Sequence, residues 1–339
     1  MARHRPDDIP PGGRILVFRA LPGLGDLLCA VPALRAIRRM RPDVEIVLVG
    51  LPSTAPLVRR FPASVDRFLP FPGFPGLPER PADVRRLPGF LASVQSWRAD
   101  LAIQLHGSGD LTNAVTALFG ARTIAGHHPA GTVPPDPARF LPWIESTSEI
   151  RRGLRLMAHL GWPSDDESLE LPIDPLADAE VDAYVPLAAG GALSDPFVCL
   201  HPGAATPARR WPPAAFAAVG DELASAGYGI VLTGGRDERL ITAAVAASMR
   251  APALDLAGRT TIDTLAAVIR RSALLVCNDT GVSHVAAALR TPSVVVFRDS
   301  DPARWAPLDR RLHRVARGSV REVVGEARRL LGDRHPHAA

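Results

Sequence analysis

The sequence contains no lysine, and arginine supplies every permanently positive side chain. A phosphate loop of the Walker A type, which depends on a lysine, is therefore excluded. Only three cysteines occur, at Cys29, Cys199 and Cys277, and each lies in an apolar segment far from the other two. They fit buried thiols of a reducing compartment better than a disulfide framework or a metal site. No apolar run approaches the roughly 20 residues that a membrane-spanning helix needs.

The charge pattern also lacks the signs of a nucleic-acid-binding protein. Aromatic residues make up 5% of the chain, and they form no stripe interleaved with basic residues. The first residues, MARHRPDDIPPGGR, contain no apolar signal region, so we expect a cytoplasmic protein. Residues 1–100 contain 15 arginines against 9 acidic residues. This excess suits an acidic acceptor or an anionic membrane surface, and it equally fits an ordinary solvated face.

The most informative stretch, residues 273–297, reads ALLVCNDTGVSHVAAALRTPSVVVF. Its two ends are apolar runs of strand length, and a helix-period segment separates them, which predicts a strand–loop–helix–strand unit with a parallel crossover. The polar residues gather in the loop and the first helical turn, where N–H groups and the helix dipole favour an anion. A phosphate or diphosphate site is one interpretation, and a plain cap by Asp279 or Thr280 is the other. The helical spacing is carried by Val282, Val285, Ala286 and Leu289.

Apolar runs and helix-period segments alternate along both halves of the chain, which predicts an α/β fold. Residues 14–175 are expected to form one doubly wound, Rossmann-like domain, and residues 197–318 a second. The acidic, proline-rich segment 176–196 is the expected linker. A terminal helix is expected at 319–332, and whether it packs back on the first domain is left open. Besides the two strands of the 273–297 stretch, the predicted strands include Arg14–Phe18, Val44–Val49, Asp100–Leu105, Phe197–Leu200 and Gly229–Leu232.

The first predicted strand runs into a glycine-rich turn that ends at Asp26. This turn resembles a dinucleotide-binding fingerprint, but such a fingerprint needs a small residue where Leu28 stands. Asp26 therefore has two interpretations. It is either the N-cap of the following helix or a base that faces the crevice outside the sheet.

Three motifs stand out in a fixed order: Gly23–Leu27 with Pro32–Leu34, His201–Ala204 with Arg209–Pro212, and Asn278–His284 with Ala288. Together they resemble glycosyltransferase family 9, the ADP-heptose:lipopolysaccharide heptosyltransferase family, and they extend across nearly the whole chain. The resemblance implies a GT-B fold, with two Rossmann-like domains that face each other across a cleft. It implies inverting transfer of a sugar, by resemblance a heptose, from an ADP-sugar to a glycan or lipopolysaccharide-core-type acceptor. No metal ion or other cofactor is expected.

The resemblance also assigns roles to single residues. Asp26 matches the family's general base, and a carboxylate opposite the leaving diphosphate suits inversion. Arg209 stands where the family has a lysine, and an arginine can still bind a diphosphate with two N–H groups. Gly25 and His106 are expected on the acceptor side. The residues expected to bind the nucleotide sugar are Arg209, Glu238, Asp279, Thr280, Gly281, Ser283 and His284.

Other segments are weaker candidates. Residues 51–98 are rich in proline, glycine and arginine, so we expect irregular loops that face the acceptor. His127 and His128 are adjacent and lack further ligands at suitable spacing, which disfavours a metal site. Asp299 and Asp301 form an Asp-x-Asp pair like that of metal-dependent glycosyltransferases of another fold, but we expect them to shape a turn.

Two other functions stay open at this point. The missing lysine would fit a non-catalytic protein that binds nucleotide sugars, and the two-domain architecture would fit a nucleotide-sugar epimerase. The expected partners are a nucleotide-sugar donor and a glycan or glycolipid acceptor, with no nucleic acid. Peripheral contact with the inner face of a membrane is left open.

Overall fold

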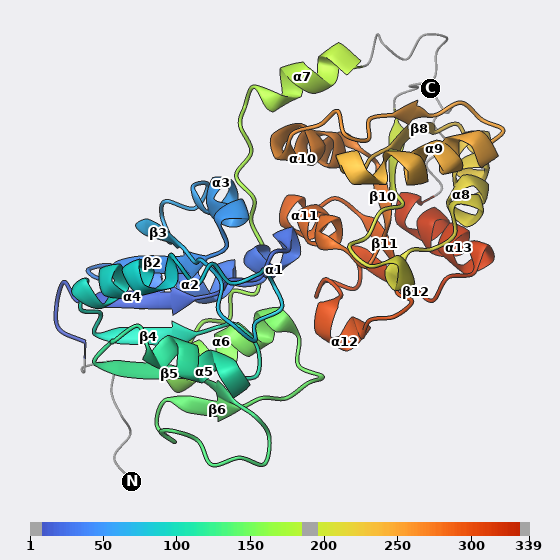
Figure 1. The fold of residues 1–339 in the computed structure, drawn as a ribbon. Coiled ribbons are helices and arrows are strands. Elements are labelled where there is room, and N and C mark those ends of the chain that lie inside the picture. Colours follow the sequence, from blue (N-terminus) through green and yellow to red (C-terminus); the bar gives the residue numbers. More distant parts are fainter. Residues whose placement is uncertain (1–8, 185–195, 333–339) are drawn as a thin grey trace. The chain divides into compact units, whose positions relative to one another are not determined.

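The computed structural model describes residues 9–184 and 196–332, and the chain divides into two compact units, Met1–Ser168 and Leu169–Ala339 (Figure 1). The division falls before the expected linker at 176–196. Part of that linker, residues 185–195, lies outside the described residues, as do 1–8 and 333–339. Each unit contains a six-stranded parallel sheet covered by helices, which confirms the predicted fold class of two Rossmann-like α/β domains.

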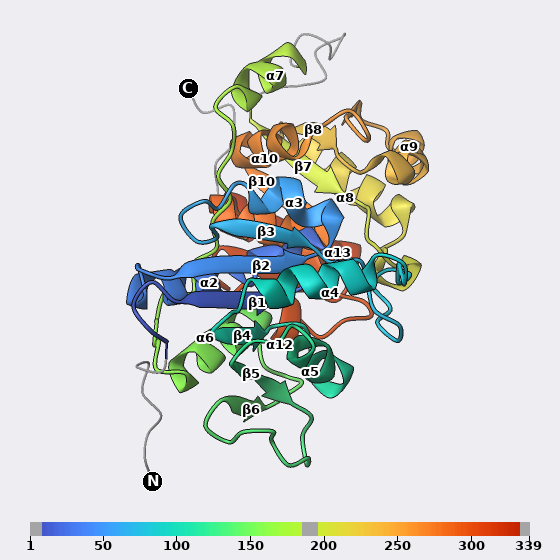
Figure 2. The ribbon, with the colours of Figure 1, turned by 60° about the vertical axis from the view of Figure 1, so that its left-hand side comes forward.

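The first unit has the strand order β3-β2-β1-β4-β5-β6. Residues Ile15–Phe18 of β1 are buried because helices cover both faces of the central strands. The helices α4 and α5 lie on one face of this sheet (Figure 2), and Leu16 and Phe18 pack with residues of both. The helices α2 and α6 pack against each other, and Gly153 allows this because a Cβ there would lie 3.1 Å from Ala33.

The strands are β1 (Arg14–Phe18), β2 (Glu45–Gly50), β3 (Arg67–Pro70), β4 (Leu101–Gln104), β5 (Thr123–His128) and β6 (Phe140–Pro142). The α-helices are α1 (Leu24–Leu28), α2 (Val31–Met40), α3 (Ala55–Val58), α4 (Leu87–Ser96), α5 (Asp110–Ala117) and α6 (Glu149–His159).

The second unit repeats this plan with the strand order β12-β11-β10-β7-β8-β9. Its central strands β7 and β10 are buried along their whole length. The strands are β7 (Phe197–His201), β8 (Gly229–Leu232), β9 (Leu254–Asp255), β10 (Leu274–Asn278), β11 (Ser293–Val296) and β12 (His313–Ala316). The α-helices are α7 (Ala177–Tyr184), α8 (Pro213–Ser225), α9 (Arg239–Ser248), α10 (Ile262–Arg271), α11 (Gly281–Leu289), α12 (Pro302–Trp305) and α13 (Val320–Leu331).

The expectation of irregular loops at 51–98 is wrong in part, because this segment contains β3 and α4. β3 is a four-residue edge strand that ends in Pro70, and a proline is tolerated there because an edge strand leaves one side without ladder hydrogen bonds. α4 carries a proline in its first turn, where the missing N–H has no intrahelical partner to lose. Both elements therefore fold despite the composition that suggested loops.

The terminal helix α13 buries its apolar face in the second unit. Val323, Val324 and Ala327 belong to the same buried cluster as Leu274 of β10 and Val296 of β11. The sequence had left open that this helix packs back on the first domain. Its apolar face is instead buried by the second unit. The spacing of the three residues explains this, because they form one stripe on an amphipathic helix.

The expected linker begins with α7, which is tied to α10 by charge. Arg270 pairs with Asp178 and Arg271 pairs with Asp182. The acidic composition that suggested a linker thus serves partly to attach this helix to the second unit. Over the described parts of the chain, no helix is both long and apolar enough to cross a membrane.

Candidate active site

The predicted site residues gather where each sheet changes its winding direction. In the first unit this point lies between β1 and β4, and Asp26 and His106 follow those two strands. In the second unit it lies between β7 and β10, which run into the His201 loop and the 278–284 turn. Loops on either side of such a point diverge and leave a crevice, where α/β proteins bind their ligands.

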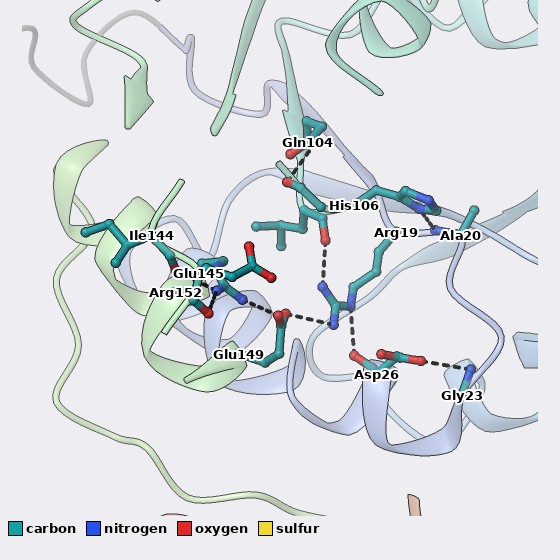
Figure 3. Close-up of polar contacts among 12 residues, drawn as sticks. Arg19, Ala20, Gly23, Asp26, Gln104, His106, Ile144, Glu145, Glu149 and Arg152 are labelled. Atoms are coloured by element: carbon teal, nitrogen blue, oxygen red, sulfur yellow. Dashed lines mark hydrogen bonds and ion pairs between the residues drawn. The ribbon is translucent and has the colours of Figure 1, made fainter. Parts of the chain in front are cut away.

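Asp26 is half-buried in the first turn of α1. Its Oδ2 accepts a hydrogen bond from the Gly23 N–H at 3.0 Å (Figure 3). A side chain at Gly23 would place a Cβ only 2.3 Å from this oxygen, so a larger residue would displace the carboxylate. Gly23 is the N-cap residue, and Asp26 bonds back to it from the third helical position, which corrects the simple N-cap interpretation. Gly25, expected on the acceptor side, is buried in the same turn.

Arg19, the residue after β1, is a buried cation that sequence reasoning missed. Its Nε donates to the backbone oxygen of Asp26 at 2.7 Å, and its Nη1 donates to that of Leu105 at 2.6 Å. Its Nη2 lies 3.7 Å from a carboxylate oxygen of Glu149. Figure 3 shows the guanidinium between Asp26 and Glu149. Arg19 therefore joins the loops that follow β1 and β4.

Glu149 and Arg152 form a buried ion pair on α6 beside Arg19. Arg152 also donates to the backbone oxygen of Ile144 at 2.8 Å. Its guanidinium carbon lies 3.7 Å from the centre of the Trp143 ring, at cation–π distance. Two arginines thus share the charge of one buried carboxylate, and each is held by further contacts.

His127 of β5 lines a small recess together with Arg19, Glu149 and Arg152. Burial lowers its pKa to about 3, and the charge of Arg152 acts in the same direction. His127 is therefore neutral near pH 7 and contributes no charge to this recess. The Nδ1 atom of His128 lies 3.2 Å from the hydroxyl oxygen of Thr132.

His106 follows β4 and is stacked on Phe18, with ring centres 4.8 Å apart. Its Nδ1 accepts a hydrogen bond from the Ala20 N–H at 2.9 Å. In the neutral ring the proton must then sit on Nε2, which lies 3.0 Å from a carboxylate oxygen of Glu79 and donates to it. Burial lowers the pKa of His106, while Glu79 opposes this shift. His106 thus attaches the proline-rich loop containing Glu79 to the end of β4.

Asn278, the last residue of β10, joins two of the three sequence motifs. Its Oδ1 accepts a hydrogen bond from the Trp211 N–H at 2.9 Å, and its Nδ2 donates to the Pro202 oxygen at 2.8 Å. The side chain is fully buried, so the amide is shielded from competing water. Asn278 therefore fixes the His-Pro-Gly loop and the Arg-Trp-Pro segment against the 278–284 turn.

Asp279 is buried beside this junction and lies 3.7 Å from Nη1 of Arg209. The Ser300 hydroxyl donates a hydrogen bond to the same carboxylate oxygen. Burial raises the pKa of Asp279, and Ser300 and Arg209 oppose the rise. The arginine in the family's lysine position is thus next to the predicted phosphate turn, and its side chain is about one-third exposed.

Thr280 occupies the N-cap position of α11, but among the described residues its side chain accepts no capping hydrogen bond. Ser283 donates its hydroxyl proton to the Thr280 backbone oxygen at 2.8 Å. Gly281 starts the helix and is partly exposed, while His284 is buried one turn further on. Three other helices of this unit do have side-chain caps, at Thr261, Asp301 and Ser319. The plain-cap interpretation therefore fails for Thr280.

Glu238 lies in the loop after β8 and reaches the His-Pro-Gly loop. Its Oε2 accepts a hydrogen bond from the Gly235 N–H at 2.8 Å and lies 3.7 Å from His201 Nε2. A Cβ at Gly203 would lie 2.0 Å from Glu238 Oε1. As at Gly23 and Asp26, a glycine makes room for the carboxylate.

Metal ligands do not converge in the part of the chain that the structure describes, where no group of three or more histidine, cysteine or acidic side chains could hold an ion. Asp301 caps the short helix α12, accepting a hydrogen bond from the Ala303 N–H at 2.9 Å. It therefore shapes a turn, as expected from the sequence.

The sequence analysis missed the roles of three charged residues and one amide: Arg19, Glu149, Arg152 and Asn278. Arg19 alone had a usable signal, because a cation directly after a five-residue apolar strand is placed at the edge where ligands bind. The assigned roles of the predicted donor and acceptor residues stay predictions.

Comparisons with known proteins identify a family and a fold. The model of glycosyltransferase family 9 (heptosyltransferase) matches residues 98–322. A comparison with curated proteins gave no match. Among solved structures, the glycosyltransferase family 9 protein of Veillonella parvula has a TM-score of 0.76 at 20% identity, over 95% of this chain and 98% of that one. ADP-heptose lps heptosyltransferase II of E. coli has a TM-score of 0.72 at 22% identity, over 94% and 98%.

A third similar structure is E. coli heptosyltransferase WaaC with ADP, with a TM-score of 0.63 at 19% identity, over 91% of this chain and 95% of that one. At these identities the structural likeness shows the fold. The family match spans most of the chain, and it shows the family as well as the fold. The chain belongs to glycosyltransferase family 9, the heptosyltransferase family, and is a glycosyltransferase of that family.

Proposed function

We propose that this glycosyltransferase transfers a heptose from an ADP-sugar to a glycan or lipopolysaccharide-core-type acceptor, with inversion at the anomeric carbon and without a metal ion. The observation that carries the proposal is the buried Asn278 junction in the second unit. It brings Arg209 to the Asp279–Gly281 turn, although the two motifs lie far apart in the sequence.

The second unit would bind the donor through its diphosphate. The guanidinium of Arg209 can bind phosphate oxygens with two N–H groups. The start of α11 offers backbone N–H groups and the positive end of the helix dipole, and the Thr280 hydroxyl is not committed to capping this helix. We expect Glu238 to accept hydrogen bonds from the ribose hydroxyls. With arginine and helix dipole stabilising the charge of the departing ADP, the reaction needs no metal.

The first unit would supply the base. Asp26 takes the proton of an acceptor hydroxyl, the hydroxyl oxygen bonds to the anomeric carbon, and the bond from that carbon to the diphosphate oxygen breaks. Attack from the face opposite the leaving group inverts the anomeric configuration. ADP carries away the bonding electrons, and Asp26 carries the proton until it is released to solvent.

The acceptor and the location of the protein follow by resemblance. The E. coli structure similar to this chain is named as an lps heptosyltransferase, which suggests a lipopolysaccharide core or a related glycan as acceptor. We expect a cytoplasmic protein, and peripheral contact with the inner face of a membrane is left open.

Donor binding tests the proposal first. Calorimetry with ADP, UDP, GDP, CDP and their sugars, in the presence of EDTA, should show preferred binding of ADP-heptose. Transfer to heptose-deficient lipopolysaccharide should then proceed in EDTA and give the inverted linkage. No nucleotide binding would overturn the proposal. Binding without transfer or hydrolysis would indicate a non-catalytic binder, and a new nucleotide sugar formed without acceptor would indicate an epimerase.

A further inference from the structure

The Arg19 guanidinium forms a buried polar junction near Asp26. The Arg19 and Glu149 side chains are only 7% and 5% exposed. Nε and Nη1 of Arg19 donate hydrogen bonds to backbone oxygens of α1 and of the loop after β4. Nη2 makes no hydrogen bond within the described residues, but it lies 3.7 Å from the Glu149 carboxylate of α6. Neither the sequence motifs nor the family match assigns this arginine a role.

The bonds of Arg19 lie where the first sheet reverses its winding. The residue follows β1, and it binds the backbone oxygens of Asp26 and Leu105, which follow β1 and β4. The next residue, Ala20, donates its N–H to His106, so the two loops are joined at adjacent positions. Loops on the two sides of this point would otherwise diverge, and these bonds set the distance between them.

We propose that Arg19 is the positioning residue of the reaction: it holds the Asp26 backbone so that the carboxylate meets the acceptor hydroxyl, and Glu149 and Arg152 hold Arg19. The inference rests on the proposed role of Asp26 as base. Arg19 bonds to the Asp26 backbone, while the carboxylate is bonded to Gly23, so Arg19 acts on the position of the base and not as a base or acid itself (Figure 3).

An arginine is required at this position by geometry. Its planar head presents donors in several fixed directions, which matches two carbonyl oxygens and one carboxylate at once. A lysine keeps the charge, but its compact ammonium cannot reach the same three oxygens in this arrangement. The Glu149–Arg152 pair would remain, so Arg19→Lys removes the junction without leaving Glu149 unpaired.

Small displacements of a base have large effects on rate. A shift of about 1 Å in a reacting group can lower the rate roughly 100-fold. Arg19→Lys should therefore lower kcat by roughly 30- to 100-fold and leave the KM for ADP-heptose unchanged.

A double-mutant cycle with Asp26 distinguishes positioning from general structural damage. Turnover of ADP-heptose with heptose-deficient lipopolysaccharide, or its slower hydrolysis by water, is measured for wild type, Arg19→Lys, Asp26→Asn and the double variant. If Arg19 acts through Asp26, Arg19→Lys lowers kcat in the wild-type background but changes it less than about twofold once Asp26 is Asn. Arg14→Lys is the matched control, because Arg14 donates to the Trp97 backbone oxygen at 2.7 Å from the opposite end of β1. It should leave kcat unchanged.

Three results would overturn the inference. They are unchanged kcat in Arg19→Lys, an equal loss in both backgrounds, or a loss as large in Arg14→Lys. If Asp26→Asn alone leaves transfer intact, the base assignment itself fails, and the positioning role fails with it.

Hydrogen exchange gives a second measurement that does not depend on turnover. In Arg19→Lys, the amides of Gly23–Leu28 should exchange faster, while those of α4 should not change. Unchanged exchange at Gly23–Leu28 would contradict the proposal, whatever the activity of the variant.

Discussion

The two units place their predicted site residues at the same point of the same topology, but they hold them by different means. In the first unit, ionic contacts among Arg19, Glu149 and Arg152 surround the Asp26 turn. In the second unit, the neutral amide of Asn278 holds the loops through hydrogen bonds to backbone atoms. The first arrangement buries two arginines around one carboxylate, whereas the second leaves the Arg209 side chain one-third exposed.

This difference agrees with what each site would do. A general base works only in a narrow range of positions, and buried, mutually paired charges hold a backbone firmly because unpairing any one of them is costly. A diphosphate site must instead keep positive charge available for an anion. A neutral scaffold serves that purpose, because it brings Arg209 and the start of α11 together without adding buried carboxylates beyond Asp279.

The two units share one feature, a glycine that makes room for a carboxylate predicted to be functional. Gly23→Ala should push the Asp26 carboxylate from its place, because the new Cβ would lie 2.3 Å from Oδ2. We expect kcat to fall roughly 10²- to 10³-fold, the range of a general base, with no change in the affinity for ADP-heptose. Single-turnover kinetics and calorimetry measure the two quantities separately.

Gly89→Ala is the matched control for that variant. Gly89 lies in α4 of the same unit, and in the described structure a Cβ there would meet no atom within 4 Å. Its kcat should equal that of wild type, and the helix should gain a few tenths to about 1 kcal/mol of stability. A fall in donor affinity in Gly23→Ala would contradict the division of roles, in which the first unit supplies the base and the second unit binds the donor.

The burial of His127 in the first unit, together with the nearby charge of Arg152, predicts that the protein loses stability in acid. Its pKa is about 3 in the fold against 6.5 in the unfolded chain. Between these two pH values the ring of His127 is protonated in the unfolded chain but stays neutral in the folded protein. The contribution of His127 to the free energy of unfolding is therefore fully present above pH 6.5 and is lost as the pH falls toward 3. This histidine alone should cost about 3 kcal/mol at pH 4 relative to pH 7.

Replacing His127 by Gln should flatten that part of the pH dependence. Urea unfolding at pH 7 and pH 4 gives the difference between wild type and variant, so contributions from other histidines cancel. If the free energy of unfolding falls as steeply with pH in His127→Gln as in wild type, the folded protein accepts a protonated His127, and its pKa is not lowered.

Arg209 tests the second unit's part of the comparison. Arg209→Ala should weaken ADP-heptose binding roughly 30-fold, because about 2 kcal/mol is typical of charge-assisted hydrogen bonds. Arg209→Lys, the family's residue, should recover part of that affinity. Calorimetry in low and high salt measures both, and kcat at saturating donor should fall less than in Gly23→Ala. Undiminished binding in Arg209→Ala would remove this residue from the donor site.

The smallest expected effect is that of Gly203→Ala. A new Cβ would lie 2.0 Å from Glu238 Oε1 and displace that carboxylate. If Glu238 binds the ribose, affinity for ADP should fall about tenfold, while affinity for an ADP lacking the ribose hydroxyls should not change. Gly325→Ala in α13 is the control, since a Cβ there meets no atom within 4 Å in the described structure. An equal loss for both ligands would assign Glu238 a purely structural role.

Sequence reasoning predicted the central strands better than the edges, for physical reasons. Strands such as β1 and β7 are buried on both faces and appear as apolar runs, and their observed bounds lie within one residue of the predicted ones. The edge strands β3, β6 and β12 are short and partly exposed, so they carry no comparable pattern. The family match is confirmed, whereas the roles of the individual site residues are still predictions.

The contacts behind the site were out of reach of the sequence. Glu149 lies at a helix start and Arg152 one turn later, a spacing that ordinarily indicates an exposed pair. The packing of α6 against α2 and β6, and the contacts with Arg19 and Trp143, bury them. Similarly, the asparagine before Asp279 gave no sign that its amide joins two distant loops.

Asp26→Asn provides the most direct test of the division of labour between the two units. The substitution keeps the size of the side chain and removes its basicity. Calorimetry with ADP-heptose and single-turnover transfer to heptose-deficient lipopolysaccharide should be measured on the same preparation. The account predicts unchanged donor affinity and a transfer rate lowered by roughly 10³-fold or more. Transfer at the wild-type rate would contradict the assignment of Asp26 as the base, and with it the central claim.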